Sequence, residues 1–184
     1  PSRSNLKPNE LNLSYSDATN ISFPDNFFDA VYSVTVLEEC DAQKSIAEIK
    51  RVLKPGGVAG IVVRALDAPQ WWNIKVSDSV NKIISVPPQM VSPKGVADMS
   101  LYEKIKLANF KNILSYPFWF TASSGNNSYI YDMYYGRARQ LLNNKQQEEF
   151  DKEIKNVNEK SQSILSVPLH CCICLLYTSD AADD

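Results

Sequence analysis

The fold is decided by one stretch, residues 28–63, which reads FDAVYSVTVLEECDAQKSIAEIKRVLKPGGVAGIVV. Its first part, residues 28–34, is a nearly continuous apolar run, as expected of a strand buried on both faces of a parallel sheet. A helix follows, because Asp41 is a suitable N-cap and apolar residues then recur at helical spacing until the Pro-Gly-Gly of residues 55–57. Residues 58–63 are apolar again, so the stretch predicts a strand, a helix and a second, parallel strand.

The same alternation continues on both sides of this stretch. Alternating apolar residues predict a strand before it, at Leu11–Tyr15. The elements expected after it are a helix, a strand, two helices and a final strand, over residues 100–109, 113–121, 130–141, 144–157 and 164–173. We therefore expect an α/β fold with a doubly wound, mostly parallel sheet. The two successive helices form an inserted helical pair at about residues 127–162.

The composition is that of one globular domain, with 184 residues, 44% of them hydrophobic and 22% charged. The formal net charge of -2 argues against nucleic acid or an anionic membrane as a partner. The most apolar stretch, residues 164–176, is too short and too interrupted to span a bilayer. The first ten residues lack the blocks of a secretory signal, and the chain does not begin with Met, so we expect a fragment.

The four cysteines are too few for a disulfide scaffold, and three of them, Cys171, Cys172 and Cys174, lie close together. A reducing, cytoplasmic location fits this pattern better. A zinc site needs four nitrogen or sulfur ligands, and outside this group the chain offers only Cys40 and the single histidine, His170. We therefore expect no metal ion.

Four motifs follow one another between residues 17 and 57. They are Asp17-Ala18, FPDNFFDAV at 23–31, VLE at 36–38 and AEIKRVLKPGG at 47–57. In this order and spacing they resemble class I S-adenosylmethionine-dependent methyltransferases, in particular the type 11, ubiquinone/menaquinone-biosynthesis-like small-molecule group. The resemblance implies a Rossmann-like fold, S-adenosyl-L-methionine as cofactor and a small-molecule methyl acceptor.

Two features of that family are missing from the sequence. The family has a Gly-rich loop after its first strand and an acidic residue after its second strand, and none of the six glycines here lies in such a loop. We therefore expect residues 1–174 to be a partial methyltransferase domain that begins near the third strand of the fold and is inactive alone. The last ten residues, 175–184, resemble translated adapter or vector sequence, and we expect a non-native tail.

The resemblance assigns five residues to the cofactor. Asp17 matches the acid that accepts a hydrogen bond from the adenine amine, and the Ala18 N–H can donate to the adenine ring. Ser33, Val34 and Thr35 match the segment that meets the methionine moiety. The alternative for Asp17 is a turn residue whose carboxylate accepts from nearby backbone amides.

Methyl transfer is an in-line displacement that positioning and exclusion of water can promote without a universal catalytic residue. Trp71 and Trp72 follow a strand, where an indole ring can cover the substrate or pack in the core. Arg64 and Asp67 are candidates for orienting a polar substrate group, with a surface salt bridge as the alternative.

Further candidates lie later in the chain. Tyr134 and Tyr135, on the first inserted helix, can line a substrate pocket or pack in the core. His170 can act as a general base or as a hydrogen-bonded structural residue. Glu39 stands where many family members have His, so a non-catalytic cofactor-binding or interaction module is the alternative function. A nicotinamide-dependent enzyme is disfavoured, because the motifs are those of methyltransferases. The methyl acceptor and the oligomeric state stay open.

Overall fold

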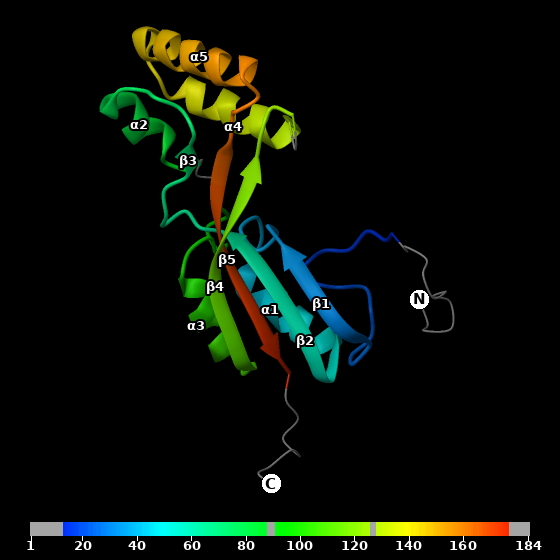
Figure 1. Ribbon diagram of the computed structural model, residues 1–184. Coiled ribbons are helices and arrows are strands. Elements are labelled where there is room, and N and C mark those ends of the chain that lie inside the picture. Colours follow the sequence, from blue (N-terminus) through cyan, green and yellow to red (C-terminus); the bar gives the residue numbers. More distant parts are fainter. Residues whose placement is uncertain (1–12, 88–90, 126–127, 177–184) are drawn as a thin grey trace. The chain divides into compact units, whose positions relative to one another are not determined.

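The computed structural model describes residues 13–87, 91–125 and 128–176. The chain divides into two compact units, whose elements are labelled in Figure 1. Each unit has its own hydrophobic core. Unit 1 consists of residues 1–63, 91–116 and 170–184, and unit 2 of residues 64–90 and 117–169. The residues predicted to bind the cofactor all belong to unit 1, and those predicted to contact the substrate all belong to unit 2.

Unit 1 is built around two parallel strands, β1 (Phe28–Val34) and β2 (Leu53–Arg64), which are joined by helix α1 (Ala42–Val52). The helix begins where the Asp41 carboxylate accepts a hydrogen bond from the Lys44 N–H at 3.2 Å. It ends at Val52, because Leu53 adopts an extended conformation and is the first residue of β2. This strand, helix and parallel strand confirm the prediction made from the same stretch of sequence.

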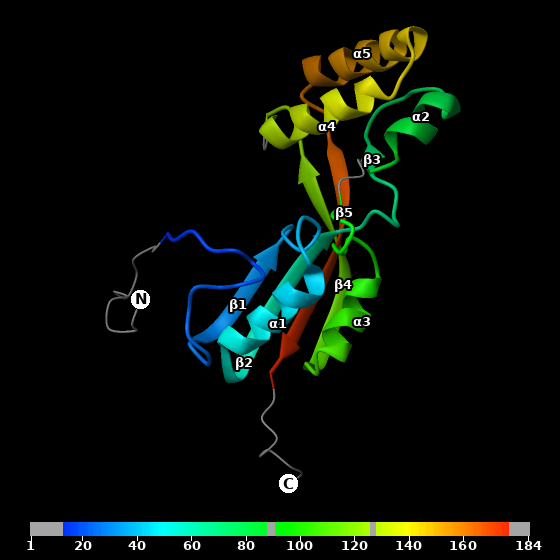
Figure 2. The same ribbon diagram turned by 180° about the vertical axis from the view of Figure 1, so that it is seen from behind.

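Helix α3 (Ser100–Leu107) and parts of two longer strands, β4 (Lys111–Ala122) and β5 (Leu165–Leu175), complete unit 1. Strand β5 lies beside β2, and β4 pairs with β5. Seen from both sides, α1 and α3 cover the same face of the strands of unit 1 (Figures 1 and 2). The buried core of the unit includes Leu37, Ile46, Ile49, Leu53, Ile61, Val63, Val96, Leu101, Ile105 and Phe110.

Strand pairing continues past the predicted end of β5. The backbone of Leu176 donates to the Gly57 carbonyl oxygen at 2.9 Å and accepts from the Gly56 N–H at 2.6 Å. The sheet therefore extends into the first two residues of the segment 175–184, whose remaining residues, 177–184, lie outside the described ranges.

Unit 2 contains the two-residue strand β3 (Trp71–Trp72) and the helices α2 (Asp78–Ile84), α4 (Ser128–Gln140) and α5 (Asn144–Glu159). Strand β3 pairs with β5 in the antiparallel direction. The core of the unit includes Trp72, Val80, Ile84, Tyr131, Tyr134, Phe150, Ile154 and Leu165. Helices α4 and α5 are the inserted pair expected from the sequence, and no helix in the described ranges is long and apolar enough to span a bilayer.

The structure corrects two expectations about strands. Residues 13–15 form no strand and are exposed, because their alternating pattern has no neighbouring strand; Leu11 and Asn12 lie outside the described ranges. Strand β1 is not buried on both faces, since Tyr32 is 83% exposed. The reason is that β1 is an edge strand, with β2 as its strand neighbour among the described residues.

Helices α3 and α5 differ in how they start. Helix α3 begins at Ser100 without a side-chain cap. Helix α5 begins with a capping box that joins Asn143 and Gln146. Strand β3 and helix α2 were not predicted, because they are too short to show a periodic pattern.

Candidate functional site

The residues predicted to bind adenine lie in a tight turn of unit 1. The Asp17 carboxylate accepts hydrogen bonds at Oδ1 from the Thr19 N–H (2.7 Å) and from the Thr19 hydroxyl (2.8 Å). The Asn20 N–H closes the turn by donating to the Asp17 carbonyl oxygen at 2.9 Å. Both bonds from Thr19 favour the ionised carboxylate and lower the pKa of Asp17. Asp17 is therefore an ionised turn residue at the surface, and its Oδ2 can accept a hydrogen bond from a ligand.

A pocket of about 360 Å³ lies at the carboxyl end of β1. It brings together Ala18, Ser33 and Val34, three of the five residues predicted to bind the cofactor. Asp17 and Thr35 are direct chain neighbours of these residues but do not line the pocket. Its apolar wall includes Ile21, Leu37 and Ile49. We call this cavity the β1 pocket.

Thr35 ends β1 in a strained conformation. Its φ angle is 51°, in the left-handed region that a β-branched residue rarely adopts. Its N–H donates to the Val62 carbonyl oxygen at 2.8 Å, which holds this backbone against β2. The sharp change of direction carries the chain from β1 into Val36 and Leu37, which line the pocket. Backbone strain of this kind is often found at functional sites.

A fully buried acid follows this turn. Glu38 is 0% exposed, and its carbonyl oxygen accepts from the Ser92 N–H at 2.7 Å. Gly95 approaches the same carbonyl so closely that a Cβ atom there would lie 2.3 Å from it. Glu38 belongs to the VLE motif at residues 36–38, and its position directly after two apolar residues was the signal in the sequence that could have marked it. Its neighbour Glu39 is exposed.

The wall of the β1 pocket is anchored to helix α1. The Ile21 N–H donates to Glu48 Oε2 at 2.7 Å, and the Ile21 carbonyl oxygen accepts from Arg51 Nη2 at 2.8 Å. Arg51 Nη1 also donates to the Phe23 carbonyl oxygen at 2.8 Å. Glu48 and Arg51 are thus positioning residues that the sequence analysis did not identify.

The β1 pocket has the chemistry to bind a flat heteroaromatic base. Its walls are largely apolar, as in most small-molecule sites. The carboxylate of Asp17 can accept from an exocyclic amine, and the Ala18 N–H can donate to a ring nitrogen, since the hydrogen bonds of the turn come from Thr19 and Asn20.

The predicted substrate residues of unit 2 are distributed over several environments. Trp72 is in the core, where its indole N–H donates to the Ile84 carbonyl oxygen at 3.1 Å, whereas Trp71 is half exposed. Arg64 is half-buried at the end of β2, and Asp67 is exposed in the following turn. Trp72 therefore packs in the core, which was the alternative to covering the substrate.

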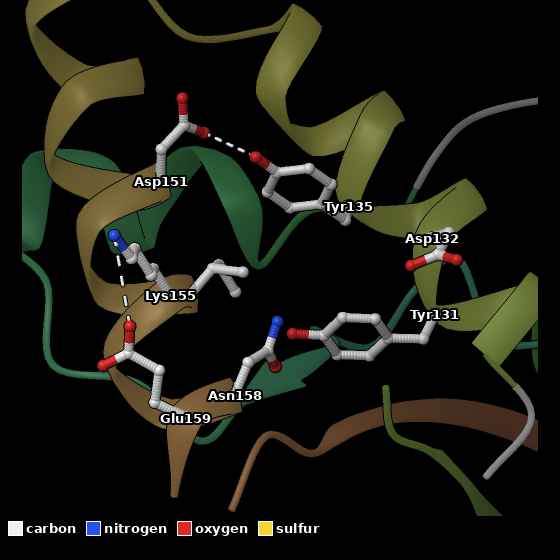
Figure 3. A pocket seen from close by; sticks show the side chains of 8 residues that line it. Tyr131, Asp132, Tyr135, Asp151, Lys155, Asn158 and Glu159 are labelled. Carbon is white, nitrogen blue, oxygen red and sulfur yellow. Dashed lines mark hydrogen bonds and ion pairs between the residues drawn. The ribbon is translucent and has the colours of Figure 1, made fainter. Parts of the chain in front are cut away.

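Tyr134 and Tyr135 also differ from each other. Tyr134 is buried in the core of unit 2, whereas Tyr135 lines a pocket of about 350 Å³ between α4 and α5 (Figure 3). The Tyr135 hydroxyl donates to Asp151 Oδ1 at 2.7 Å, and Arg139 Nε donates to the same carboxylate at 3.0 Å. Burial, together with the nearby Asp151 carboxylate, raises the pKa of Tyr135 to about 12. Tyr135 is therefore a neutral hydrogen-bond donor.

Within the described ranges, no three acidic, cysteine or histidine residues gather in a way that could hold a metal ion. The cysteines near the end of the chain are buried free thiols, and burial raises the pKa of Cys174 to about 12. Such thiols are protonated and do not act as nucleophiles. His170 lies half-buried on β5.

Comparison with known proteins gives a match over the same part of the chain. Residues 2–61 match the family described as methyltransferase domain. Sterol 24-C-methyltransferase ERG6A of Gibberella zeae is 48% identical over 54 residues, which are 29% of this chain and 14% of that protein. Sterol 24-C-methyltransferase erg6 of Aspergillus fumigatus is 43% identical over 53 residues, 28% of this chain and 14% of that protein. The match thus spans a small part of these curated relatives.

A solved structure from Bacillus halodurans C-125, described as that of a candidate methyltransferase, is 17% identical with a TM-score of 0.50. The alignment covers 89% of this chain and 70% of that chain, and at this level of identity it shows the fold. The chain therefore has the Rossmann-like fold of that structure, and its residues 2–61 match the methyltransferase domain family.

Proposed function

We propose that this chain carries the adenosine-binding part of an S-adenosylmethionine-dependent methyltransferase that acts on a small molecule. The observation that carries the proposal is that Ala18 and the adjacent pair Ser33 and Val34, which come from two separate segments, line one pocket inside the segment that matches the methyltransferase family. Asp17, beside this pocket, adds the carboxylate that an exocyclic amine needs.

Different roles in binding are proposed for the residues that line the pocket and for Asp17 beside it. Asp17 and the Ala18 N–H recognise the edge of the adenine ring, and the apolar side chains of Ile21 and Leu37 cover its face. Ser33 and Val34, at the end of β1, lie where the chain can meet the rest of the cofactor. The cofactor supplies a methyl group on a sulfonium, so the protein has to orient the reactants and exclude water.

The sterol methyltransferases among the relatives support a small-molecule acceptor, and the net charge of -2 supports no nucleic-acid partner. We also propose that these 184 residues alone do not transfer methyl groups, because their six glycines include no Gly-rich loop after a strand. A reducing, cytoplasmic location is proposed from the buried free thiols.

The proposal is tested by measuring binding of S-adenosylhomocysteine to the chain by saturation-transfer NMR. We expect saturable binding, with magnetisation transferred to the adenine protons. Asp17→Ala should weaken it by about 1 to 3 kcal/mol, the range for a hydrogen bond to a charged group. The matched control is Asp98→Ala, because Asp98 also lies in unit 1 and accepts a backbone hydrogen bond, from Ser100 at 2.9 Å.

Equal loss of binding in the Asp17 and Asp98 variants, with both proteins folded by circular dichroism, would remove Asp17 from the site. Binding that is as strong in both variants as in the unmodified chain would also remove Asp17 from the site. No saturable binding by the unmodified chain would contradict the proposed adenosine site itself.

A further inference from the structure

A second pocket, of about 600 Å³, lies entirely in unit 2 and is formed by β3, α2, β4 and β5. Two of the three tryptophans of the chain line it: Trp71 on β3, which is 53% exposed, and Trp119 on β4, which is 47% exposed. We call this cavity the Trp71 pocket. Its volume is in the range of small-molecule sites, and exposed aromatic side chains that gather at one cavity often mark such a site.

The exposure of Trp71 follows from the register of β3. Trp72 is 4% exposed and packs against Tyr131 and Phe150, with ring centroids 5.7 and 5.6 Å away. Successive side chains of a strand project to opposite faces, so burial of Trp72 directs Trp71 away from that core. Trp71 lies opposite Ser166 of β5, which also lines the pocket.

Gln70 provides a hydrogen-bond acceptor that has no donor among the described residues. The residue is only 3% exposed. Its Nε2 donates to the Ile84 carbonyl oxygen at 2.6 Å, and its N–H donates to the Ser85 carbonyl oxygen at 2.8 Å. Its Oε1 is buried without a hydrogen-bond partner among the described residues. A buried carbonyl oxygen without a donor costs free energy. Gln70 lines the Trp71 pocket, so a ligand O–H or N–H group that enters beside this side chain would supply the missing bond.

The other polar groups of the pocket are also uncharged. The Ser85 hydroxyl donates to Asn81 Oδ1 at 3.3 Å, so the amide nitrogen of Asn81 is the part that can donate to a ligand. Among the described residues that line the pocket, none has a charged side chain. A charged ligand would therefore lose hydration without gaining a counter-charge, which disfavours it. The two indole rings favour a ligand with a ring face to stack against them.

We propose that the Trp71 pocket binds an uncharged ring compound that carries hydroxyl groups, with the pyranose ring of a neutral glycoside as the simplest example. A hydroxyl group can donate to Gln70 Oε1 and accept from the Asn81 amide. The ring then stacks on Trp71 or Trp119. This inference goes beyond the proposed methyl transfer and depends on other residues, so either can fail without the other.

The first test is a titration of the intrinsic tryptophan fluorescence with methyl β-D-glucopyranoside and methyl β-D-galactopyranoside. Methyl β-D-glucuronide is the matched probe, because it has the same ring with one negative charge. We expect a saturable change with a neutral glycoside and binding at least tenfold weaker with the glucuronide. Absence of a saturable change with both neutral glycosides overturns the proposal, as does equal binding of the charged probe.

The second test uses variants, with binding measured by saturation-transfer NMR. Trp71→Ala and Trp119→Ala should each weaken binding about fivefold, as expected for loss of an aromatic contact. Phe118→Ala is the matched control, because Phe118 is the neighbour of Trp119 on β4, is 50% exposed and does not line the pocket. If Phe118→Ala weakens binding as much as Trp119→Ala, or if neither tryptophan variant weakens it, the pocket is not the site. Circular dichroism confirms that each variant is folded.

Discussion

Arg51 and Glu48, one turn apart on α1, are joined side by side: Arg51 Nε donates to Glu48 Oε1 and Arg51 Nη2 to Glu48 Oε2, each at 2.8 Å. The pair raises the pKa of Arg51 and lowers that of Glu48, so both stay charged. Arg51 also donates to Asp25 Oδ1 at 2.8 Å. The pair thereby attaches the loop that contributes Ile21 to the β1 pocket.

Arg51→Ala should therefore lower the free energy of unfolding by about 2 kcal/mol, because several charge-assisted hydrogen bonds are lost together and Glu48 is left without them. Urea denaturation measures this change. The control is Lys155→Ala, since Lys155 forms only a distant surface ion pair with Glu159, at 4.0 Å. Equal effects of the two substitutions would show that the Arg51 contacts do not stabilise the loop.

Gly95→Ala should destabilise the protein by about 1 to 3 kcal/mol, because the new Cβ would lie 2.3 Å from the Glu38 carbonyl oxygen and the backbone would have to move. Gly136→Ala, in helix α4, should instead raise the free energy of unfolding by up to about 1 kcal/mol, since nothing lies within 4 Å of a Cβ atom there. Thermal and urea unfolding of both variants test the prediction. A Gly95→Ala protein as stable as the parent would contradict this close approach.

Thr35→Gly should leave stability unchanged or raise it by up to about 1 kcal/mol, because glycine adopts a φ of 51° without the steric cost that a β-branched residue has. Thr121→Gly, at an exposed position of β4, should instead destabilise by about 1 kcal/mol. Urea denaturation of the two variants gives the comparison. Equal destabilisation would mean that Thr35 is not strained.

The environment of Tyr135 predicts a pH dependence. Its folded-state pKa of about 12 lies above the ordinary tyrosine value of 10.0, so its contribution to stability is present below pH 10.0 and is lost as the pH rises through about 12. An ultraviolet titration should show a late step to which Tyr135 and the buried Tyr131 both contribute, and Tyr135→Phe should reduce its amplitude by one tyrosine. Asp151→Asn should lower the pKa of Tyr135, because a neighbouring negative charge is removed. No late step in the parent protein would contradict the hydrogen bond to Asp151.

The strands and the helix of residues 28–63 could be predicted because their signals are local. Apolar runs and the Asp41 cap each act within a few residues, and the structure confirms them. The Pro-Gly-Gly segment does not end the helix as predicted, because α1 already ends at Val52 and residues 55–57 lie within β2. The grouping of Ala18 with Ser33 and Val34 depended on the family resemblance, because no local pattern shows that two separate segments meet.

Other features depend on contacts between distant parts of the chain. Sequence alone did not distinguish the buried Trp72 from the exposed Trp71, because the difference follows from their register opposite Leu165 and Ser166. The exposure of β1 could not be predicted either, since its apolar run is the same whether or not a second strand lies beside it. Gln70 gave no signal, because its unpartnered oxygen arises only when β3 packs beside α2.

Two-dimensional ¹⁵N NMR of the chain titrated with S-adenosylhomocysteine shows whether the β1 pocket is an adenosine site. We expect saturable shifts of the Ala18 and Val34 amides, with the unit 2 amides of Trp71 and Tyr135 unchanged. Adenosine alone should shift the Ala18 amide in the same direction, because the turn is proposed to recognise the base. Shifts confined to unit 2, or saturable binding that leaves the Ala18 and Val34 amides unmoved, would contradict the claim.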